Sequence, residues 1–372
     1  MKILITDIHH GNGGGHVTYV LSLLRGLRHQ HDLTVAAPET GRLYKLASLM
    51  QGVRVQPGLY TSRPLPLIRE VIQLRRFLKR ERFDVVHVNG GADHRHVMLA
   101  CLGMRQRPAI VWTKHNTNRV CSLGHRLRAW LGTHASIAVC DYVARMLAES
   151  GYRRRPIHMV RNGIDLDYLK PVEEAAKRAY RRALFGELDD GVLVLGSIGG
   201  TDLNKGWLDL VQAVAGLEPA LRRRLRIVVA GDPPAAAMQR RVRELGMQGR
   251  VVFPGLVKDV RHILGASDIG FVLSYREAAS YASCETMAMG LPALVSNAGG
   301  LPENVRDGLD GWVVPAGDIP ALQRTLRAIL AEPACVAVRG RSARARVEQA
   351  FSTAGFLRQT QSVYAQARGL AV

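Results

Sequence analysis

Two carboxylates and one lysine in the second half of this 372-residue chain have the types and spacing of a site for an anionic ligand. Glu277 follows an apolar run, and Glu285 stands eight positions later in the first turns of a predicted helix. Both carboxylates can face one pocket, and the amides between them, around Ser280 and Tyr281, would point at negative charge. Lys205 precedes a glycine at another predicted helix start. A lysine at this position can pair with a diphosphate, and the alternative is that these residues simply begin a helix.

The first half of the chain carries a glycine-rich loop and a histidine, each directly after a predicted strand. The loop HHGNGGGH, residues 9–16, contains Gly14 and Gly15, whose lack of a side chain lets the backbone approach a ligand. Its spacing matches neither a dinucleotide fingerprint nor a phosphate-binding loop, so an anion site and a structural turn both stay open. His115 follows the apolar run 110–113, and an imidazole at a strand end can act as a base or as a donor to developing charge.

The elements that must position these residues are the strands and helices of parallel sheets. Short apolar runs alternate with helical patterns in two series, which indicates two α/β domains. The first series covers residues 2–7, 33–37, 85–88, 110–113 and 136–139; the second covers 192–197, 225–230, 250–253, 269–273 and 293–296. We therefore predict two Rossmann-like, doubly wound domains that face a central cleft, over residues 1–165 and 166–350, and a final helix within 351–372.

Composition and charge narrow the function classes. Apolar residues make up 47% of the chain and the mean hydropathy is −0.02, which excludes a disordered or polytopic membrane protein. The net charge is +20, and residues 1–165 hold 25 basic and 10 acidic residues against 26 and 21 in the remainder. This asymmetry predicts a polyanionic partner or surface for the N-terminal half, with ordinary surface decoration as the alternative.

The expected compartment is the cytoplasm. The apolar run at the start is too short for a signal peptide, and no stretch reaches the roughly 18 apolar residues of a spanning helix. The five cysteines contain no Cys-x-x-Cys pair and are interpreted as reduced thiols.

A basic amphipathic helix is predicted over residues 67–82. Its apolar stripe of Leu67, Val71, Leu74 and Leu78 is expected to pack on the sheet. The six basic residues beside the stripe either face solvent or rest on an anionic membrane, which would place the protein peripherally on the inner face of the cytoplasmic membrane.

The order and spacing of these motifs resemble the GT-B glycosyltransferases of family 4, which are retaining enzymes that use nucleotide sugars. The resemblance covers nearly the whole chain. It rests on the Glu-x7-Glu element of Glu277 and Glu285 and on several further motifs, namely Ala288-Met289-Gly290-Leu291-Pro292, Asn162-Gly163-Ile164-Asp165, Lys205-Gly206, Gly231-Asp232, Phe253-Pro254-Gly255 and Gly299-Gly300-Leu301-Pro302-Glu303. It implies the GT-B fold, with an N-terminal acceptor domain, a C-terminal donor domain and a last helix that crosses back to the N-terminal domain.

The resemblance also implies roles for the donor-site residues. Lys205 would hold the diphosphate, Glu285 the ribose and Glu277 the hydroxyls of the transferred sugar, with Ser280 and Tyr281 lining the same site. The donor would be a UDP-sugar in preference to a GDP-sugar.

On the acceptor side, the resemblance implies that His115 contacts the sugar near the reacting carbon and that the Gly14-Gly15 backbone approaches the diphosphate. The acceptor would be a glycan or a lipid-linked glycan in lipopolysaccharide or cell-envelope polysaccharide assembly. The resemblance implies no cofactor and no metal.

Two departures from the family pattern concern the donor site. Gly200 stands where the family places an arginine, five residues before Lys205, and Arg276 or Arg161 could replace that charge. Residues 278–280 read Ala-Ala-Ser in place of Gly-Phe-Gly, which leaves the sugar open.

One pair of aspartates has the spacing of a metal motif. Asp165 and Asp167 have the Asp-x-Asp spacing of metal-dependent sugar transferases, but they lie in the interdomain link and are predicted to cap a helix. No metal site is predicted.

Two other function classes stay open. A nucleotide-sugar epimerase or hydrolase on the same fold would form product from the donor alone. A non-catalytic polyanion-binding protein would account for the charge of +20 but not for Lys205 and the paired glutamates. We therefore predict no nucleic-acid partner.

Overall fold

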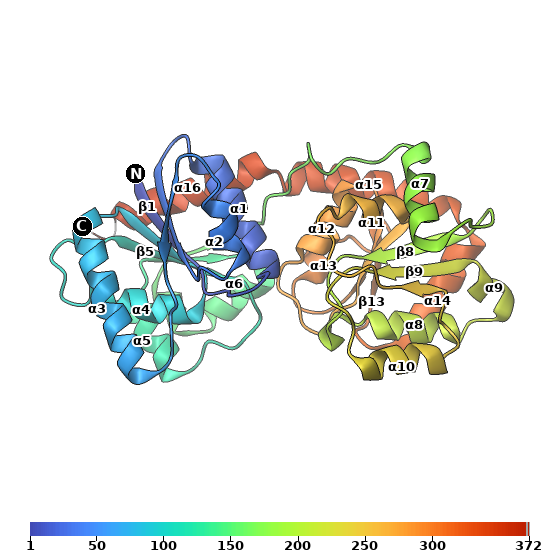
Figure 1. The fold of residues 1–372 in the computed structure, drawn as a ribbon, viewed down its shortest axis with the longest axis horizontal. Helices are drawn as coiled ribbons and strands as arrows, with labels where there is room; N and C mark the ends of the chain where they lie inside the picture. Colours follow the sequence, from blue (N-terminus) through green and yellow to red (C-terminus); the bar gives the residue numbers. More distant parts are fainter. Residues whose placement is uncertain (370, 372) are drawn as a thin grey trace. The chain divides into compact units, whose positions relative to one another are not determined.

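The computed structural model describes residues 1–369 and Ala371, which form two compact units (Figure 1). Unit 1 comprises Met1–Gly163 and the segment from Thr353 onward, and unit 2 comprises Ile164–Ser352. The boundaries expected from the sequence, after residues 165 and 350, lie two residues from these. Leu370 and Val372, which belong to the predicted final helix, lie outside the described residues.

Unit 1 is built on a parallel sheet of seven strands in the order β3-β2-β1-β4-β5-β6-β7. Its central strands are almost entirely aliphatic and buried, because helices cover both faces (Figure 1). The strands are β1 (Lys2–Thr6), β2 (Asp32–Ala37), β3 (Val53–Pro57), β4 (Val85–Val88), β5 (Ala109–Lys114), β6 (Ala135–Ala138) and β7 (Ile157–Met159).

The helices of unit 1 lie in two layers. In Figure 1, α1, α2 and α16 lie on one side of the sheet, and α3, α4 and α5 lie on the other. Their bounds are α1 (Gly14–Leu27), α2 (Arg42–Ala47), α3 (Pro64–Glu81), α4 (Gly91–Cys101), α5 (Leu123–Leu131), α6 (Asp141–Ala148), the 3-10 turn η1 (Gly151–Arg154) and α16 (Thr353–Gly369).

Strands β3 and β7 were not predicted from the sequence, and helix α3 differs from its expected packing. Helix α1 begins at Gly14, directly after Gly13, which adopts a left-handed conformation, with φ of 68°, at the N-cap. Helix α3 packs chiefly against α4 rather than on the sheet, and of its apolar stripe only Leu78 is fully buried.

The C-terminal helix α16 belongs to unit 1, which confirms the predicted return of the chain to the N-terminal domain. Phe356 and Tyr364 of α16 are buried, and the Phe356 ring lies 5.1 Å from that of Tyr19 on α1. The Tyr364 hydroxyl lies 2.6 Å from His87 Nδ1 on β4, and His87 Nε2 lies 2.6 Å from Thr113 Oγ1 on β5. A buried imidazole thus links two central strands to α16.

Unit 2 is built on a second parallel sheet, of six strands in the order β10-β9-β8-β11-β12-β13. Together with the sheet of unit 1 it confirms the prediction of two doubly wound α/β domains. The strands are β8 (Leu193–Ser197), β9 (Leu225–Val229), β10 (Val251–Val252), β11 (Ile269–Val272), β12 (Ala293–Ser296) and β13 (Gly311–Val314).

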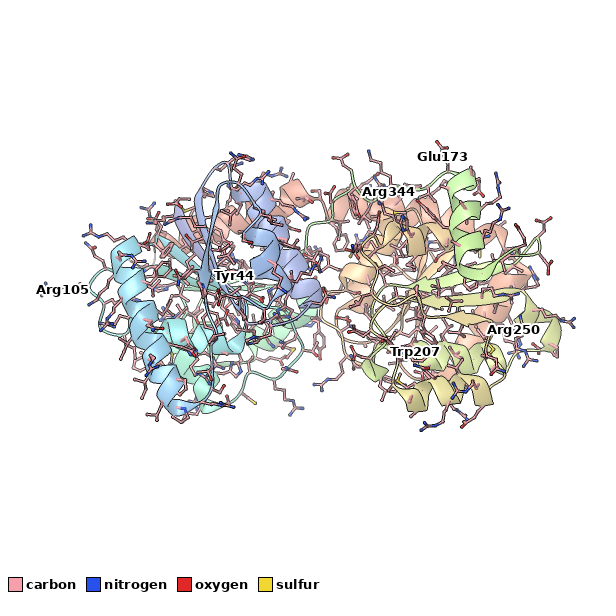
Figure 2. All side chains as sticks on the ribbon, viewed as in Figure 1. Tyr44, Arg105, Glu173, Trp207, Arg250 and Arg344 are labelled. Carbon is pink, nitrogen blue, oxygen red and sulfur yellow. The ribbon has the colours of Figure 1, made fainter. Side chains whose placement is uncertain are left out.

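Hydrophobic cores cover both faces of the second sheet. Trp207 is buried in the largest of them with Phe271 and Leu294 (Figure 2), while Met287 and Val295 belong to another. The helices are α7 (Glu174–Phe185), the 3-10 turn η2 (Leu203–Lys205), α8 (Trp207–Ala215), α9 (Pro219–Arg223), α10 (Ala236–Glu244), α11 (Arg261–Ala266), α12 (Tyr281–Ala288), α13 (Leu301–Asn304), α14 (Ile319–Ala331) and α15 (Ala334–Ala350).

We expect unit 1 to lose stability as the pH falls below about 6.5, the pKa of histidine in an unfolded chain. Burial lowers the pKa of both His87 and His94 to about 3. Between these values the unfolded chain binds protons that the folded chain excludes, so the stability is complete above about pH 6.5 and declines toward pH 3. The slope is at most about 1.4 kcal/mol per pH unit for each residue.

Urea unfolding at about pH 7.5 and pH 5 measures this slope. His87→Asn should make the pH dependence shallower, whereas His10→Asn, at an exposed position, should leave it unchanged. Equal slopes in wild type and His87→Asn would contradict the assignment.

Candidate functional site

In unit 2, the structure brings Lys205 and Glu277 together at one edge of the sheet. Strands β8 and β11 pair directly, so the loops that follow them emerge side by side. Lys205 ends η2, after β8, and Glu277 lies between β11 and α12. Lys205 Nζ donates to Glu277 Oε2 over 2.9 Å, and the side chains are 26% and 18% exposed. A ligand can therefore reach both groups.

Hydrogen bonds from backbone and side-chain groups connect the two loops. The Asn204 carbonyl accepts from the Tyr275 N–H over 2.9 Å, and Asn204 Nδ2 donates to the Arg276 carbonyl over 3.1 Å. Ser274 Oγ donates to Glu277 Oε2 over 3.4 Å. Asn204 and Ser274 were not identified from the sequence, although each stands within three residues of a predicted site residue.

The other predicted donor-site residues lie on or beside α12. Ser280 is buried and its hydroxyl accepts from the Ser283 N–H over 3.2 Å, so its side chain caps the helix. Tyr281 begins α12, and Glu285 lies one turn further along it, half-buried. Ser280 therefore caps α12, and Tyr281 and Glu285 lie in the first turns of that helix.

The arginines considered as substitutes for the charge missing at Gly200 lie in different units. Arg276 is exposed and precedes Glu277 in unit 2. Arg161 belongs to unit 1, where its guanidinium pairs with Asp141 over 3.1 Å. Of the two, Arg276 therefore lies in unit 2, on the loop that also carries Glu277.

In unit 1, residues that follow three neighbouring strands meet at one edge of the sheet. Asp7 follows β1, Asn89 follows β4 and His115 follows β5, and these strands pair in that order. His115 Nε2 lies 2.9 Å from Asn89 Oδ1. The Nδ2 atom of Asn89 donates to the Thr6 carbonyl over 3.0 Å. Asn89 was not identified from the sequence, but it fixes the orientation of the His115 ring.

Burial favours the neutral form of two imidazoles at this edge, those of His16 and His115. Desolvation lowers the pKa of His115 well below its usual value and that of His16 to about 4, and the two rings lie 4.4 Å apart. Burial also lowers the pKa of Lys114 to about 8. His9 shifts the other way, because its hydrogen bond to Asp7 raises its pKa. A neutral His115 that donates Nε2–H to Asn89 retains a lone pair on Nδ1.

Gly14 and Gly15 form the first turn of α1, beside these histidines. In the described part of α1, no side chain caps this turn and no acidic residue stands in it. Gly13, the N-cap residue, could not carry a Cβ, which would collide with Val17 and come within 3.1 Å of His9 Cβ. The loop therefore presents free backbone amides and a helix N-terminus, as an anion site requires.

Asp165 accepts hydrogen bonds from the backbone of the interdomain link. Asp165 Oδ1 accepts from the backbone N–H groups of Asp167 and Tyr168 over 3.2 and 3.0 Å. The predicted helix cap was wrong in one respect, since Asp165 closes a turn rather than a helix.

None of the helices within residues 1–369 combines the length and apolarity needed to cross a bilayer.

Several known proteins with related sequences or folds are glycosyltransferases. The model of Glycosyltransferase Family 4 matches residues 13–168, and that of Glycosyl transferases group 1 matches residues 190–332. A 2-deoxystreptamine glucosyltransferase from Streptomyces kanamyceticus is 30% identical over 201 residues, which are 54% of this chain and 51% of that protein. The chain therefore matches about half the length of this relative.

Two solved structures share the fold. Anabaena Alr3699/HepE in complex with UDP has a TM-score of 0.84 at 20% identity, over 98% of this chain and 100% of that one. HepE has also been solved with UDP-glucose. The lipopolysaccharide outer core galactosyltransferase WaaB has a TM-score of 0.73 at 15% identity, over 98% of this chain and 99% of that one.

Gly206 should be indispensable for the position of Lys205. Its φ is 64°, and an added Cβ would collide with the Leu273 carbonyl oxygen. Gly246 has the same φ of 64° but open space around it, so Gly246→Ala is a matched control. We expect Gly246→Ala to cost about 1 to 2 kcal/mol of unfolding free energy and Gly206→Ala clearly more, as measured by urea unfolding. An equal loss of unfolding free energy in the two variants would show that the loop can move to accommodate a side chain at position 206.

Proposed function

Since the chain belongs to the GT-B glycosyltransferases, with a family 4 domain followed by a group 1 domain, we propose that it transfers a sugar, with retention, from a nucleotide-sugar donor to a glycan or lipid-linked acceptor. Unit 2 would bind the donor and unit 1 the acceptor.

The contact between Lys205 Nζ and Glu277 Oε2 is the observation that carries the proposal. A sugar diphosphate presents anionic oxygens next to hydroxyl groups, so it needs a cation and a hydrogen-bond acceptor a few ångströms apart. Before the donor binds, the Lys205 ammonium and the Glu277 carboxylate neutralise each other's charge through their hydrogen bond. When it binds, Lys205 would turn to the diphosphate and Glu277 would accept from the sugar hydroxyls.

Other groups would complete the donor site. Glu285 on α12 would bind the ribose, and the amides at the start of α12 would face negative charge. The Gly14-Gly15 amides of unit 1 would approach the diphosphate. A neutral His115, oriented by Asn89, would contact the sugar near the reacting carbon.

The protein would contribute orientation and charge stabilisation rather than a covalent intermediate. The leaving phosphate would take the proton of the acceptor hydroxyl on the face from which it departs, while Lys205 stabilises its charge. Donor activation in this scheme requires no cofactor and no metal.

We favour a UDP-sugar donor, hexosyl or N-acetylhexosaminyl, and an acceptor from lipopolysaccharide or envelope polysaccharide assembly. The UDP and UDP-glucose complexes of HepE support the choice of base, and the fold shared with WaaB supports the acceptor class. The excess of basic residues in residues 1–165 suits a phosphorylated or membrane-held acceptor.

Replacement of the donor-site pair tests the function. Lys205→Ala and Glu277→Gln should each lower kcat for sugar transfer about 100-fold or more, because each removes a group that contacts the transition state. Lys170→Ala removes the same charge from an exposed pair with Asp167 and should retain turnover. Full turnover in both site variants would refute the assignment.

A panel of nucleotide diphosphates and their sugars, assayed by thermal shift, identifies the donor. A ligand at 100 times its Kd should stabilise the protein by about 2.7 kcal/mol. Product formation from the donor alone, without acceptor, would favour an epimerase or hydrolase instead.

We further propose that unit 1 docks peripherally on the cytoplasmic face of an anionic membrane. Helices α3 and α5 both pack against α4, and each exposes an apolar stripe at helical spacing. On α3 these residues are Leu65, Ile68 and Ile72, and on α5 they are Leu123, Leu127 and Trp130, with exposures from 40% to 81%. Exposed basic residues accompany both stripes: Arg69, Arg76, Lys79 and Arg80 on α3, and Arg126 on α5.

Vesicle sedimentation tests this docking. The double variant Leu65→Gln/Ile68→Gln should bind phosphatidylglycerol vesicles about 100-fold or more weakly, because insertion of each aliphatic side chain contributes about 1.5 kcal/mol or more. Leu49→Gln alters a residue of unit 1 that is 83% exposed but lies outside both stripes, and it should bind like wild type. Wild-type binding that is equal for neutral and anionic vesicles would contradict the proposal.

A further inference from the structure

We propose that Asp7, His9 and His16 form a binding site in unit 1 for a divalent transition metal of the zinc class. This site goes beyond the proposed transferase function, since the residues that would bind the donor in unit 2 take no part in it. It uses side chains that the transferase scheme leaves without a role.

The three side chains already converge. One ligand atom from each lies within 4.8 Å of the other two. His9 Nδ1 lies 3.0 and 3.1 Å from the two carboxylate oxygens of Asp7. The His9 and His16 rings lie 4.6 Å apart. Tetrahedral zinc with bonds of about 2.1 Å separates its ligand atoms by about 3.4 Å, so small side-chain rotations complete the triad.

One nitrogen of the three side chains is buried without a hydrogen-bond partner among the described residues. Within the part of the chain that the structure describes, His16 Nδ1 is buried and has no hydrogen-bond partner. A buried polar atom of this kind costs free energy unless something satisfies it. A metal ion would provide that partner, and Asp7, which is fully buried, would supply the negative charge.

The surrounding backbone holds the triad in place. The backbone N–H of His9 donates to Asp7 Oδ1 over 2.9 Å, which orients the carboxylate. Gly13 and Gly41 both pack against His9, and a Cβ on Gly41 would collide with the His9 carbonyl oxygen. The Arg42 N–H donates to the Gly11 carbonyl over 3.0 Å, which ties the loop to α2. Such outer contacts are typical of sites that hold metal ligands in a fixed arrangement.

The ligand set selects the class of metal. Two imidazoles and one carboxylate suit Zn²⁺, Co²⁺ or Ni²⁺, whereas Mg²⁺ and Ca²⁺ prefer oxygen ligands throughout. Three protein ligands leave a fourth position for water. The site would therefore resemble an open zinc site rather than a closed structural one.

Metal titration of the full chain, without a polyhistidine tag and without nucleotide sugar, tests the proposal. Cys121 is an exposed free cysteine, so a Cys121→Ser background removes a competing thiolate. We expect calorimetry with Zn²⁺, and elemental analysis after dialysis, to give one tightly bound ion per chain. His9→Gln and His16→Gln should each weaken binding about tenfold or more.

Two control variants separate this site from other histidines and from the donor site. His10→Gln alters an exposed histidine of the same loop, and Lys205→Ala alters the donor site; both should bind Zn²⁺ like wild type. Circular dichroism and thermal unfolding without metal establish that the variants are folded. The absence of stoichiometric Zn²⁺ binding by the wild type, or wild-type affinity in folded His9→Gln and His16→Gln, would overturn the proposal without affecting the transferase assignment.

Discussion

Parallel strand pairing is the constraint on which the chemistry of both units depends. Every strand of a parallel sheet ends at the same edge, so residues far apart in sequence become neighbours when their strands are adjacent. In unit 2 this brings Lys205 to Glu277 across a separation of 72 residues. In unit 1 it brings Asp7, Asn89 and His115 to the ends of β1, β4 and β5. The functional groups belong to loops, but the strand order decides which loops meet.

The two sheet edges differ in the charge state of their side chains, because the groups in unit 1 are more deeply buried. At the edge in unit 1, burial lowers the pKa of His16 and His115, which favours their neutral forms. In unit 2, Lys205 and Glu277 stay partly exposed and form an ion pair. A partly exposed pair of this kind contributes little to stability.

The sequence predicted most of the strands that consist of buried apolar runs, although it missed β13 (Gly311–Val314), and it failed where tertiary context decides. Strand β4 reads Val-Val-His-Val and was predicted with its observed bounds, because a strand covered on both faces is continuously apolar. Strand β3 lies at the sheet edge and was missed because its apolar residues alternate with the polar Arg54 and Gln56. Strand β7 was missed because it has only three residues. At the site, the resemblance identified Lys205 and Glu277 individually. The contacts of Asn89 and Asn204 could not be predicted, since they depend on which loops lie side by side.

Backbone geometry explains the family departure at Gly200. Gly200 has φ of 93°, and a Cβ on Gly231 would lie 2.8 Å from the Gly200 Cα, so the two backbones pack directly. An arginine at position 200 would occupy the left-handed region at a cost of about 1 kcal/mol or more. The family arginine is therefore absent because the backbone conformation at position 200 favours glycine. A diphosphate bound at this edge would rely on Lys205, on the exposed Arg276 and on backbone amides. The lysine would thus contribute a larger share of the binding free energy here than in relatives that pair it with an arginine.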